Sequence, residues 1–278
     1  MTGLSPEALA IRAHRIGASE LAAALGLSPY GGPFDVFARI VCNIQRADSP
    51  EFASGRRLAR AVLDYYEETF GTILIRDPGP RVHPRLDFLS CTPDAETQTG
   101  CINVQAKTDR DRSAWGEPGT DQVPVHIAVQ VQCEMAILEC TITHVPVYFK
   151  GADSWETFIV PRDQAVIDHL ERGAADFWNR HVVGGEMPAL DGGNAAASYL
   201  RKRYPGGAPL AVATPEQRAM VTAYSEQKAT IKRLTSEADI MRQRIALELG
   251  DSNGWEGLCT YKPNVKGVRS LRLAGEKE

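Results

Sequence analysis

Apolar residues recur at helical spacing over the first quarter of the chain, which predicts helices there. Residues 34–44 (FDVFARIVCNI) and 51–71 (EFASGRRLARAVLDYYEETFG) place apolar side chains three and four positions apart, so that they share one face of a helix. A helix that begins at Pro6 and a shorter one over 18–26 are expected before them. Proline suits the first helical turn, and Gly26 is the kind of residue that ends a helix.

After residue 72 the pattern changes to short runs separated by proline and glycine, which is typical of strands. Strands are expected at 73–77, 81–83, 87–92, 102–107, 143–151 and 155–161. Two further helices are expected at 125–138 and 162–182. This order predicts an α/β (α+β) fold in which a central mixed β-sheet is flanked by helices.

The composition changes near residue 190, which suggests a domain boundary. We expect a first domain over 1–190, a Gly/Pro/Ala-rich linker over 191–213 and a C-terminal extension over 214–278. The extension begins with a long charged helix, from Pro215 to about residue 250, and ends with a basic β-hairpin. The hairpin's cations are Lys262, Lys266, Arg269 and Arg272. Two readings stay open for them, a solvated hairpin and an appendage that tracks DNA or docks a partner.

The charge of the chain argues against a protein that coats nucleic acid over its whole surface. The 278 residues carry a formal net charge of −4, whereas such proteins are strongly basic. A local basic patch is still compatible with this balance.

The cysteines and the apolar runs indicate a cytoplasmic protein. Six cysteines are present and none forms a CxxC pair, so their spacing predicts neither a zinc nor an iron–sulfur site. We expect reduced, buried thiols. We also expect no signal peptide and no membrane span, because the N-terminus lacks a basic region followed by an apolar run and no apolar run approaches the roughly 20 residues of a span.

The candidate chemistry lies in CTPDAETQTGCINVQAKT, residues 91–108. Residues 103, 105 and 107 are polar and their neighbours apolar, so a strand here sends Gln105 and Lys107 to the same face. Asp94 at a nearby strand end would supply a carboxylate for Mg²⁺. Lys107 would orient a water and stabilise charge on a phosphate. These residues predict metal-dependent phosphodiester cleavage, although the pattern alone is common on surface hairpins.

Other motifs make the pattern more specific. Several segments follow one another along the chain in a fixed order, namely IRAHRIGASELAAALGLSPYGGPFDVF, the Gly55–Leu58 helix segment, TPDA, VQAKT, VPVHIAVQVQCEM and VPRDQ followed by FWNRHV. In this order they resemble the YqaJ-like phage recombinases, relatives of lambda exonuclease in the PD-(D/E)xK nuclease superfamily. The resemblance covers roughly residues 5–185. It implies a restriction-endonuclease-like core and a metal-dependent exonuclease that acts on double-stranded DNA ends in phage-type recombination.

The resemblance also implies roles for individual residues. Asp94 matches the metal-binding aspartate, Gln105 the second acidic ligand, and Lys107 the catalytic lysine, with Mg²⁺ or Mn²⁺ as cofactor. The carbonyl of Ala106 matches a position that can face the metal. Further residues match positions that contact DNA or flank the site, namely Arg12 and Ser19 for the terminal phosphate and Gln130 and Gln132 on the neighbouring helix. A ring-shaped homo-oligomer and a single-strand annealing partner are implied as well.

Two departures from the family pattern concern the metal. Gln105 offers a neutral amide oxygen where a carboxylate is usual. Ala59 stands where the family's helix carries an acid, and it offers no oxygen. We expect Glu134, Glu96 and Asp109 to be solvated rather than to replace these acids.

A second hypothesis follows from the two departures. The chain could be a nuclease fold that has weakened catalytically and now holds DNA ends or a protein. Two structural alternatives also stay open, because Arg12 could be a surface charge and Ser19 could cap the second helix. Gln130 and Gln132 are two residues apart and cannot share a helix face, and we expect Gln130 to be the one that faces the site.

Overall fold

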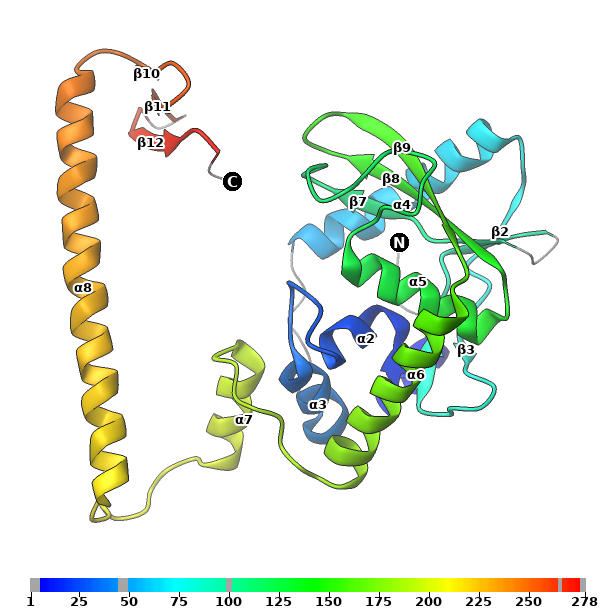
Figure 1. Ribbon diagram of the computed structural model, residues 1–278, viewed down its shortest axis with the longest axis horizontal. Coiled ribbons are helices and arrows are strands. Elements are labelled where there is room, and N and C mark those ends of the chain that lie inside the picture. The colour runs from blue at the N-terminus through cyan, green and yellow to red at the C-terminus, as the bar shows by residue number, and fades with distance from the viewer. Residues whose placement is uncertain (1–5, 45–49, 99–101, 265–266, 276–278) are drawn as a thin grey trace. The chain divides into compact units, whose positions relative to one another are not determined.

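The chain forms two compact units, Met1–Gly206 and Gly207–Glu278 (Figure 1). The computed structural model describes residues 6–44, 50–98, 102–264 and 267–275. The first unit contains the central sheet and the candidate site, and the second contains a long helix and a small sheet.

The helices of the first unit lie close to the ranges predicted from apolar spacing. They are α1 Pro6–Ala13, α2 Ala18–Ala24, α3 Pro33–Cys42, α4 Pro50–Phe70, α5 Val125–Leu138, α6 Gln164–Phe177, the π-helix η1 Trp178–Val183 and α7 Asn194–Arg203. As expected, α2 ends next to a glycine in the left-handed region: Gly26 has φ +71°. The Leu27 N–H donates to the Ala22 carbonyl at 2.7 Å, which closes the helix end.

The central sheet is mixed, as predicted. Its strands are β2 Leu74–Arg76, β5 Ala95–Thr97, β6 Ile102–Val104, β7 Lys107–Asp109, β8 Ile142–Phe149 and β9 Ser154–Pro161. Both β6 and β7 run parallel to β8 in one register, in which Val104 pairs with His144 and Lys107 with Val147. They are therefore two halves of one interrupted strand. On its other side β6 pairs antiparallel with β5, a strand that the sequence did not predict.

Two of the predicted strands belong to a second, smaller sheet. Its strands are β1 Ile16–Gly17, β3 Arg81–Val82 and β4 Leu89–Cys91. β4 pairs parallel with β1 and antiparallel with β3. The loop between α1 and α2 is thereby tied to the segment that leads to Asp94.

Helices cover both faces of the central sheet (Figure 1). α5 lies on one face, in a cluster that includes Val131, Met135, Val145, Val147 and Phe158. α4 lies on the other face, in a cluster formed by Val62, Leu63, Tyr66, Leu74, Val104, Ala95 and Ala106. Burial of each side chain the size of valine to phenylalanine contributes about 1.5–3 kcal/mol. The strand that carries Lys107 lies between these two layers of packed side chains.

The first unit extends further than the predicted boundary at 190. Part of the predicted linker, 191–213, is the helix α7, which packs on α3. Ala196 is buried, and the Tyr199 ring makes edge contacts with Phe34 and Phe37 at centroid distances of 5.7 and 6.2 Å. The Gly/Ala-rich composition had suggested a linker, but it includes an apolar helix face with Ala196 and Tyr199 on it.

The second unit has the predicted long helix and hairpin, with one additional strand. Its elements are α8 Pro215–Leu249, β10 Gly254–Trp255, β11 Cys259–Pro263 and β12 Arg269–Leu273. Thr214 caps α8: its hydroxyl accepts from the Gln217 N–H at 3.3 Å, and the Gln217 side chain accepts from the Thr214 N–H at 2.9 Å. β11 pairs antiparallel with both β10 and β12.

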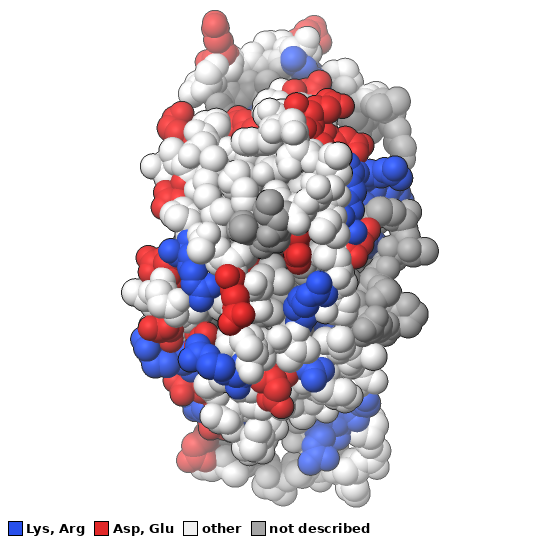
Figure 2. Space-filling model, turned by 90° about the vertical axis from the view of Figure 1, so that its right-hand side faces the viewer, with Lys and Arg blue, Asp and Glu red and all other residues white. Residues whose placement is uncertain are grey.

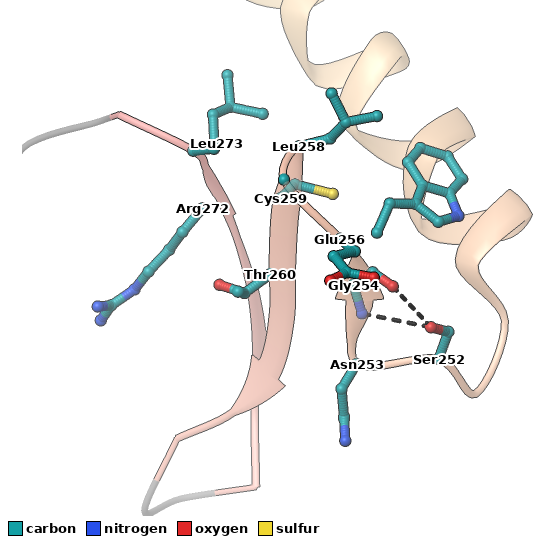
Figure 3. Close-up of a pocket in the computed structure, with 12 residues that line it drawn as sticks. Ser252, Asn253, Gly254, Glu256, Leu258, Cys259, Thr260, Arg272 and Leu273 are labelled. Carbon is teal, nitrogen blue, oxygen red and sulfur yellow. Dashed lines mark hydrogen bonds between the residues drawn. The ribbon is translucent and has the colours of Figure 1, made fainter.

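One cation of the hairpin has a structural role. The Arg269 guanidinium donates to the carbonyls of Tyr261, Gly250 and Ser252 and lies 4.3 Å from the centroid of the Tyr261 ring. It therefore ties the hairpin to the end of α8. Beside it, residues 252–260 and 272–274 line an open concavity of about 370 Å³ (Figure 3).

Over the ranges that the structure describes, no helix is both long and apolar enough to span a membrane.

Candidate active site

Asp94 stands at the start of β5 and faces the interrupted strand β6–β7. Its Oδ2 accepts two hydrogen bonds, from the Ala106 N–H at 3.0 Å and from Gln105 Nε2 at 2.8 Å. Burial raises the pKa of the Asp94 carboxyl to about 6, while the Lys107 ammonium and the Ala106 N–H oppose this rise. The carboxylate is thus fixed by backbone and side chain together.

The strand presents its polar residues to α5 and its apolar residues to α4. Val104 and Ala106 pack in the cluster under α4. Asn103 and Lys107 hydrogen-bond to side chains of α5. This is the alternation expected of an extended strand.

Gln105 is 5% exposed and uses only one end of its amide. Nε2 donates to Asp94, whereas Oε1 is buried and has no hydrogen-bond partner within the described part of the chain. An unpaired buried carbonyl costs about 1–3 kcal/mol. This oxygen therefore has a free lone pair next to a carboxylate.

Lys107 begins a chain of hydrogen bonds that runs into the core. Its Nζ donates to Gln130 Oε1 at 2.9 Å, and Gln130 Nε2 donates to Glu134 Oε1 at 2.8 Å. The other carboxylate oxygen of Glu134 accepts from Asn103 Nδ2 at 2.8 Å. The ammonium is thereby held through α5 on the face of the strand that also carries Gln105.

The prediction that Glu134 is solvated was wrong. Its side chain is 1% exposed. Burial raises the pKa of Glu134 to about 7, and the Lys107 ammonium and the two amide donors lower it again in part. The sequence contained a signal for this: α5 is apolar almost all round, and such helices are buried.

Glu96 and Asp109 are partly exposed, so neither is as solvated as predicted. Glu96 is half-buried and its Oε1 is enclosed without a hydrogen-bond partner in the described chain. Asp109 accepts from Trp115 Nε1 at 2.9 Å and from the Arg110 N–H at 2.6 Å, which fixes the loop after β7.

Arg12 and Ser19 lie on either side of Gly17 at the N-terminus of α2. A Cβ at Gly17 would be 3.7 Å from Arg12 Nε and 3.9 Å from Ser19 Oγ. Arg12 also pairs with Glu20, at 3.0 Å. The cap of α2 is Gly17 rather than Ser19, and the Gly17 N–H donates to the Glu20 carboxylate at 3.3 Å. No motif in the sequence singled out Glu20, whose contacts with Arg12 and Gly17 appear only in the folded chain.

The Gln132 side chain points toward the start of α6, whereas the Gln130 side chain points toward Lys107. Its Nε2 donates to the Pro161 carbonyl at 2.8 Å, and its Oε1 accepts from the Asp163 N–H at 3.0 Å. Both ends of the amide are therefore used to join α5 to the start of α6. The two glutamines diverge because residues two apart lie on different sides of a helix.

Ala59 is half-buried and packs against the apolar cluster under α4. One turn earlier, Gly55 faces β7, and a Cβ there would be 3.6 Å from Thr108 Oγ1. The helix thus reaches the active-site strand but provides no carboxylate from position 59.

The residues fit a divalent cation bound by few charged ligands. Asp94 offers a carboxylate and Gln105 an unpaired carbonyl oxygen, and Mg²⁺ commonly binds through one or two carboxylates with waters completing its shell. Within the described ranges, no three or more His, Cys, Asp or Glu residues form a group that could hold a metal. Both oxygens of Glu134 accept amide N–H groups, so this acid is not a free ligand.

The sequence and the fold resemble those of known proteins. Residues 8–143 match the YqaJ-like viral recombinase domain. The chain carries a YqaJ-like viral recombinase domain. Asp94, Gln105, Lys107 and Glu134 all lie within the matched residues, so the whole hydrogen-bonded site belongs to this YqaJ-like domain.

Two relatives extend the comparison beyond the domain. The uncharacterized protein YqaJ of Bacillus subtilis (strain 168) is 27% identical over an alignment 272 residues long, which covers 94% of this chain and 83% of that protein. The alkaline exonuclease LHK-Exo of Laribacter hongkongensis is 16% identical with a TM-score of 0.53, over 72% of this chain and 97% of that one. LHK-Exo in complex with dAMP gives a TM-score of 0.54 at the same identity and coverage. The YqaJ-like domain therefore has the fold of an alkaline exonuclease.

Proposed function

We propose that this YqaJ-like protein is a divalent-metal-dependent exonuclease that degrades double-stranded DNA from its ends in phage-type recombination. The observation that carries the proposal is the position of Lys107. Its ammonium is held by Gln130 at 2.9 Å, on the strand whose Gln105 bonds Asp94. The fold shared with an enzyme named as an alkaline exonuclease supports the same reaction.

Asp94 and Gln105 would hold Mg²⁺ or Mn²⁺, with the Ala106 carbonyl as a further oxygen. When bound, the cation polarises the scissile phosphate and lowers the pKa of an attacking water. Gln105 lowers the negative charge of the site relative to a carboxylate, so we expect weaker binding of the cation.

Lys107 is the catalytic residue of this proposal. Its ammonium orients the attacking water and stabilises the negative charge that develops on the phosphate oxygens. Gln130 fixes the ammonium in place by accepting a hydrogen bond from one of its N–H groups. This leaves two N–H donors of Lys107 for the water and the phosphate.

Arg12 and Ser19 are proposed to bind the terminal phosphate of the DNA at the N-terminus of α2, where backbone N–H groups favour an anion. Arg12 would exchange its ion pair with Glu20 for the phosphate. A local site of this kind suits a protein whose surface charges are mixed: on the face in Figure 2, lysine and arginine side chains alternate with aspartate and glutamate. Gln132, with both amide ends engaged, contributes to packing in this proposal rather than to DNA binding.

The remaining proposals rest on the family resemblance. They are a ring of identical subunits around the DNA, a single-strand annealing protein as partner and the cytoplasm of a bacterial host cell as the place of action.

A second candidate function is favoured by Gln105 and Ala59. In this reading the YqaJ-like fold has lost its cation and holds DNA ends or a protein without cutting. The two functions differ in their metal affinity, because only the nuclease needs Asp94 as a ligand.

Isothermal titration with Mn²⁺ separates the two functions. The wild-type protein and Asp153→Asn are expected to bind the ion, and Asp94→Asn is expected to lose most of this binding. Asp153 is a matched control whose carboxylate bonds Tyr148 at 2.8 Å. Absence of Mn²⁺ binding by the wild-type protein favours the binding module.

A further inference from the structure

A buried carboxylate on α5 controls the orientation of two amide side chains. Glu134 receives Gln130 Nε2 on one oxygen and Asn103 Nδ2 on the other, both at 2.8 Å. An ionised carboxylate can only accept hydrogen bonds. Each amide must therefore turn its NH₂ group toward Glu134 and its oxygen away.

The orientation imposed on Gln130 decides what Lys107 meets. With its NH₂ group on Glu134, Gln130 presents Oε1 to the Lys107 ammonium. The reversed amide would place two N–H donors against an ammonium, which has no acceptor. A neutral amide in place of Glu134 could bond either end of Gln130, so the Lys107 ammonium alone would then favour one of these two orientations.

We propose that Glu134 is a positioning residue for the reaction. It acts through Gln130 to fix the Lys107 ammonium beside Asp94 and Gln105, and it supplies from α5 a negative charge that neutral Gln105 does not supply from the strand. This inference rests on the proposed nuclease function. It adds a carboxylate, outside the residues expected from the family pattern, on which the rate of cleavage depends.

An exchange of the two side chains tests the proposal. In the double variant Gln130→Glu/Glu134→Gln, the new carboxylate at 130 accepts from Lys107 and from the amide at 134. The amide oxygen at 134 then accepts from Asn103. Every hydrogen bond of the chain can thus be kept, and only the bond between positions 130 and 134 reverses its direction. Glu134→Gln alone loses the orientation that a carboxylate imposes on Gln130, and Gln130→Glu alone opposes two carboxylates.

The readout is kcat and KM for degradation of a linear duplex with Mn²⁺. Each single variant should lower kcat about tenfold or more with little change in KM, and the double variant should regain most of the loss. The control Glu171→Gln, at a carboxylate that bonds His83 and Arg85, should keep the wild-type kcat. Circular dichroism and thermal unfolding identify any variant that loses kcat only because it does not fold.

The outcomes separate this inference from the function on which it rests. If the wild-type protein cuts DNA and Glu134→Gln cuts equally well, or if the exchange restores nothing in a folded protein, the positioning role is wrong and the nuclease stands. If the wild-type protein does not cut, the proposed function fails first, and the role of Glu134 fails with it.

A separate observation concerns α8. This helix has 35 residues, and within the second unit it buries the side chain of Leu249, in its last turn. Long helices in globular proteins usually gain their stability from a packed apolar face. Seven apolar residues of α8 follow the alternating three- and four-residue spacing of a coiled-coil seam, namely Met220, Tyr224, Ile231, Leu234, Ala238, Met241 and Ile245.

The residues beside this seam complement a second copy of the same helix. Glu237 occupies the g position of one heptad, and Arg242 occupies the e position of the next. Both side chains are exposed. In a parallel, in-register pair these two positions face each other across the seam, so Glu237 meets Arg242 of the other copy. Gln227, a polar residue in the seam, meets its own counterpart only in the same register.

We infer that α8 is a self-association surface that forms a parallel coiled coil with a second copy of this chain. Light scattering on the full chain should give a multiple of 30.4 kDa. Ile231→Glu places a charge in the seam and should lower the measured mass below that of the wild-type protein. Ile240→Glu, at an apolar position outside the seam that is 48% exposed, should leave the assembly intact.

The charge pair tests the direction of the helices. Glu237→Arg should weaken the assembly by opposing Arg242, and Glu237→Arg/Arg242→Glu should restore it. A monomeric wild-type protein contradicts the inference. So does an assembly whose mass Ile231→Glu leaves unchanged, because α8 would then hold no subunits together, and so does equal disruption by Ile231→Glu and Ile240→Glu.

Discussion

Gln105 Nε2 donates a 2.8 Å hydrogen bond to Asp94 Oδ2, at the position where two carboxylates would repel each other. The amide therefore stabilises the site without a metal, and its unpaired Oε1 is left for a cation. Compared with a glutamate, glutamine at position 105 should weaken the proposed metal site and stabilise the metal-free protein.

Gln105→Glu should destabilise the metal-free protein and make its stability depend on metal. Two carboxylates at this distance replace a hydrogen bond, which should lower the free energy of unfolding by about 1–3 kcal/mol. Added Mn²⁺ should raise the Tm of this variant more than that of the wild-type protein. Gln132→Glu is the matched control, because Gln132 is also 5% exposed but bonds Pro161 and Asp163. It should lose stability without any added response to Mn²⁺, and an equal response in both variants would count against a metal at Gln105.

Lys107→Met should abolish most cleavage and leave DNA binding nearly intact. Loss of a group that stabilises developing charge costs roughly 100-fold or more in kcat, and DNA affinity depends on other contacts. Lys150→Met is the control, since Lys150 Nζ approaches Ser54 Oγ at 3.4 Å and takes no part in the chain from Lys107 to Glu134. Single-turnover cleavage and a duplex-binding assay give the two quantities. Full cleavage by Lys107→Met would exclude the proposed role.

The stability of the protein should fall as the pH rises from about 4.5 to about 7. The folded pKa of Glu134, about 7, lies above the ordinary value of 4.5 that applies to the unfolded chain. The folded state therefore binds more protons in this window, and ionisation at higher pH favours unfolding. The contribution is on the order of 3 kcal/mol. Asp94, with its pKa raised to about 6, contributes with the same sign, and the Lys107 ammonium opposes both.

Glu134→Gln should flatten this dependence in part. Denaturant unfolding of both proteins at pH 5 and pH 8 measures the difference in slope. Because the variant has no charge to bury at position 134, its stability relative to wild type should be greater at pH 8 than at pH 5. Parallel curves for the two proteins would show that Glu134 does not titrate across this window.

Ala59→Glu should restore a carboxylate close to Ala106 at the expense of stability. Ala59 packs against the apolar cluster under α4, so an unpaired acid there should cost about 1–3 kcal/mol. If the acid reaches the metal, Mn²⁺ should bind more tightly and offset this loss. Titration calorimetry and thermal unfolding with and without Mn²⁺ test the two effects. A stability loss that Mn²⁺ does not offset would place the new side chain away from the cation.

The sequence predicted the layered fold because its helices and strands differ clearly in apolar spacing. The face shared by Gln105 and Lys107 followed from strand alternation alone. Interactions between distant segments could not be obtained this way. The bond from Lys107 to Gln130 joins β7 to α5, and Glu134 was misjudged because its charge was weighed without the apolar helix around it. Helix α7 was missed because Gly and Ala at 192–197 suggest a linker until Tyr199 is placed on Phe34.

The most direct test of the nuclease proposal is digestion of a linear, 5′-phosphorylated duplex with Mg²⁺ or Mn²⁺, beside a covalently closed circle of the same sequence. The proposal predicts that the wild-type protein shortens the linear duplex from its ends, spares the circle and loses this activity with EDTA or in Lys107→Met. Cleavage of the circle would indicate an endonuclease. Binding of the linear duplex without any cleavage, with either ion, would contradict the central claim and leave a DNA-end-binding module.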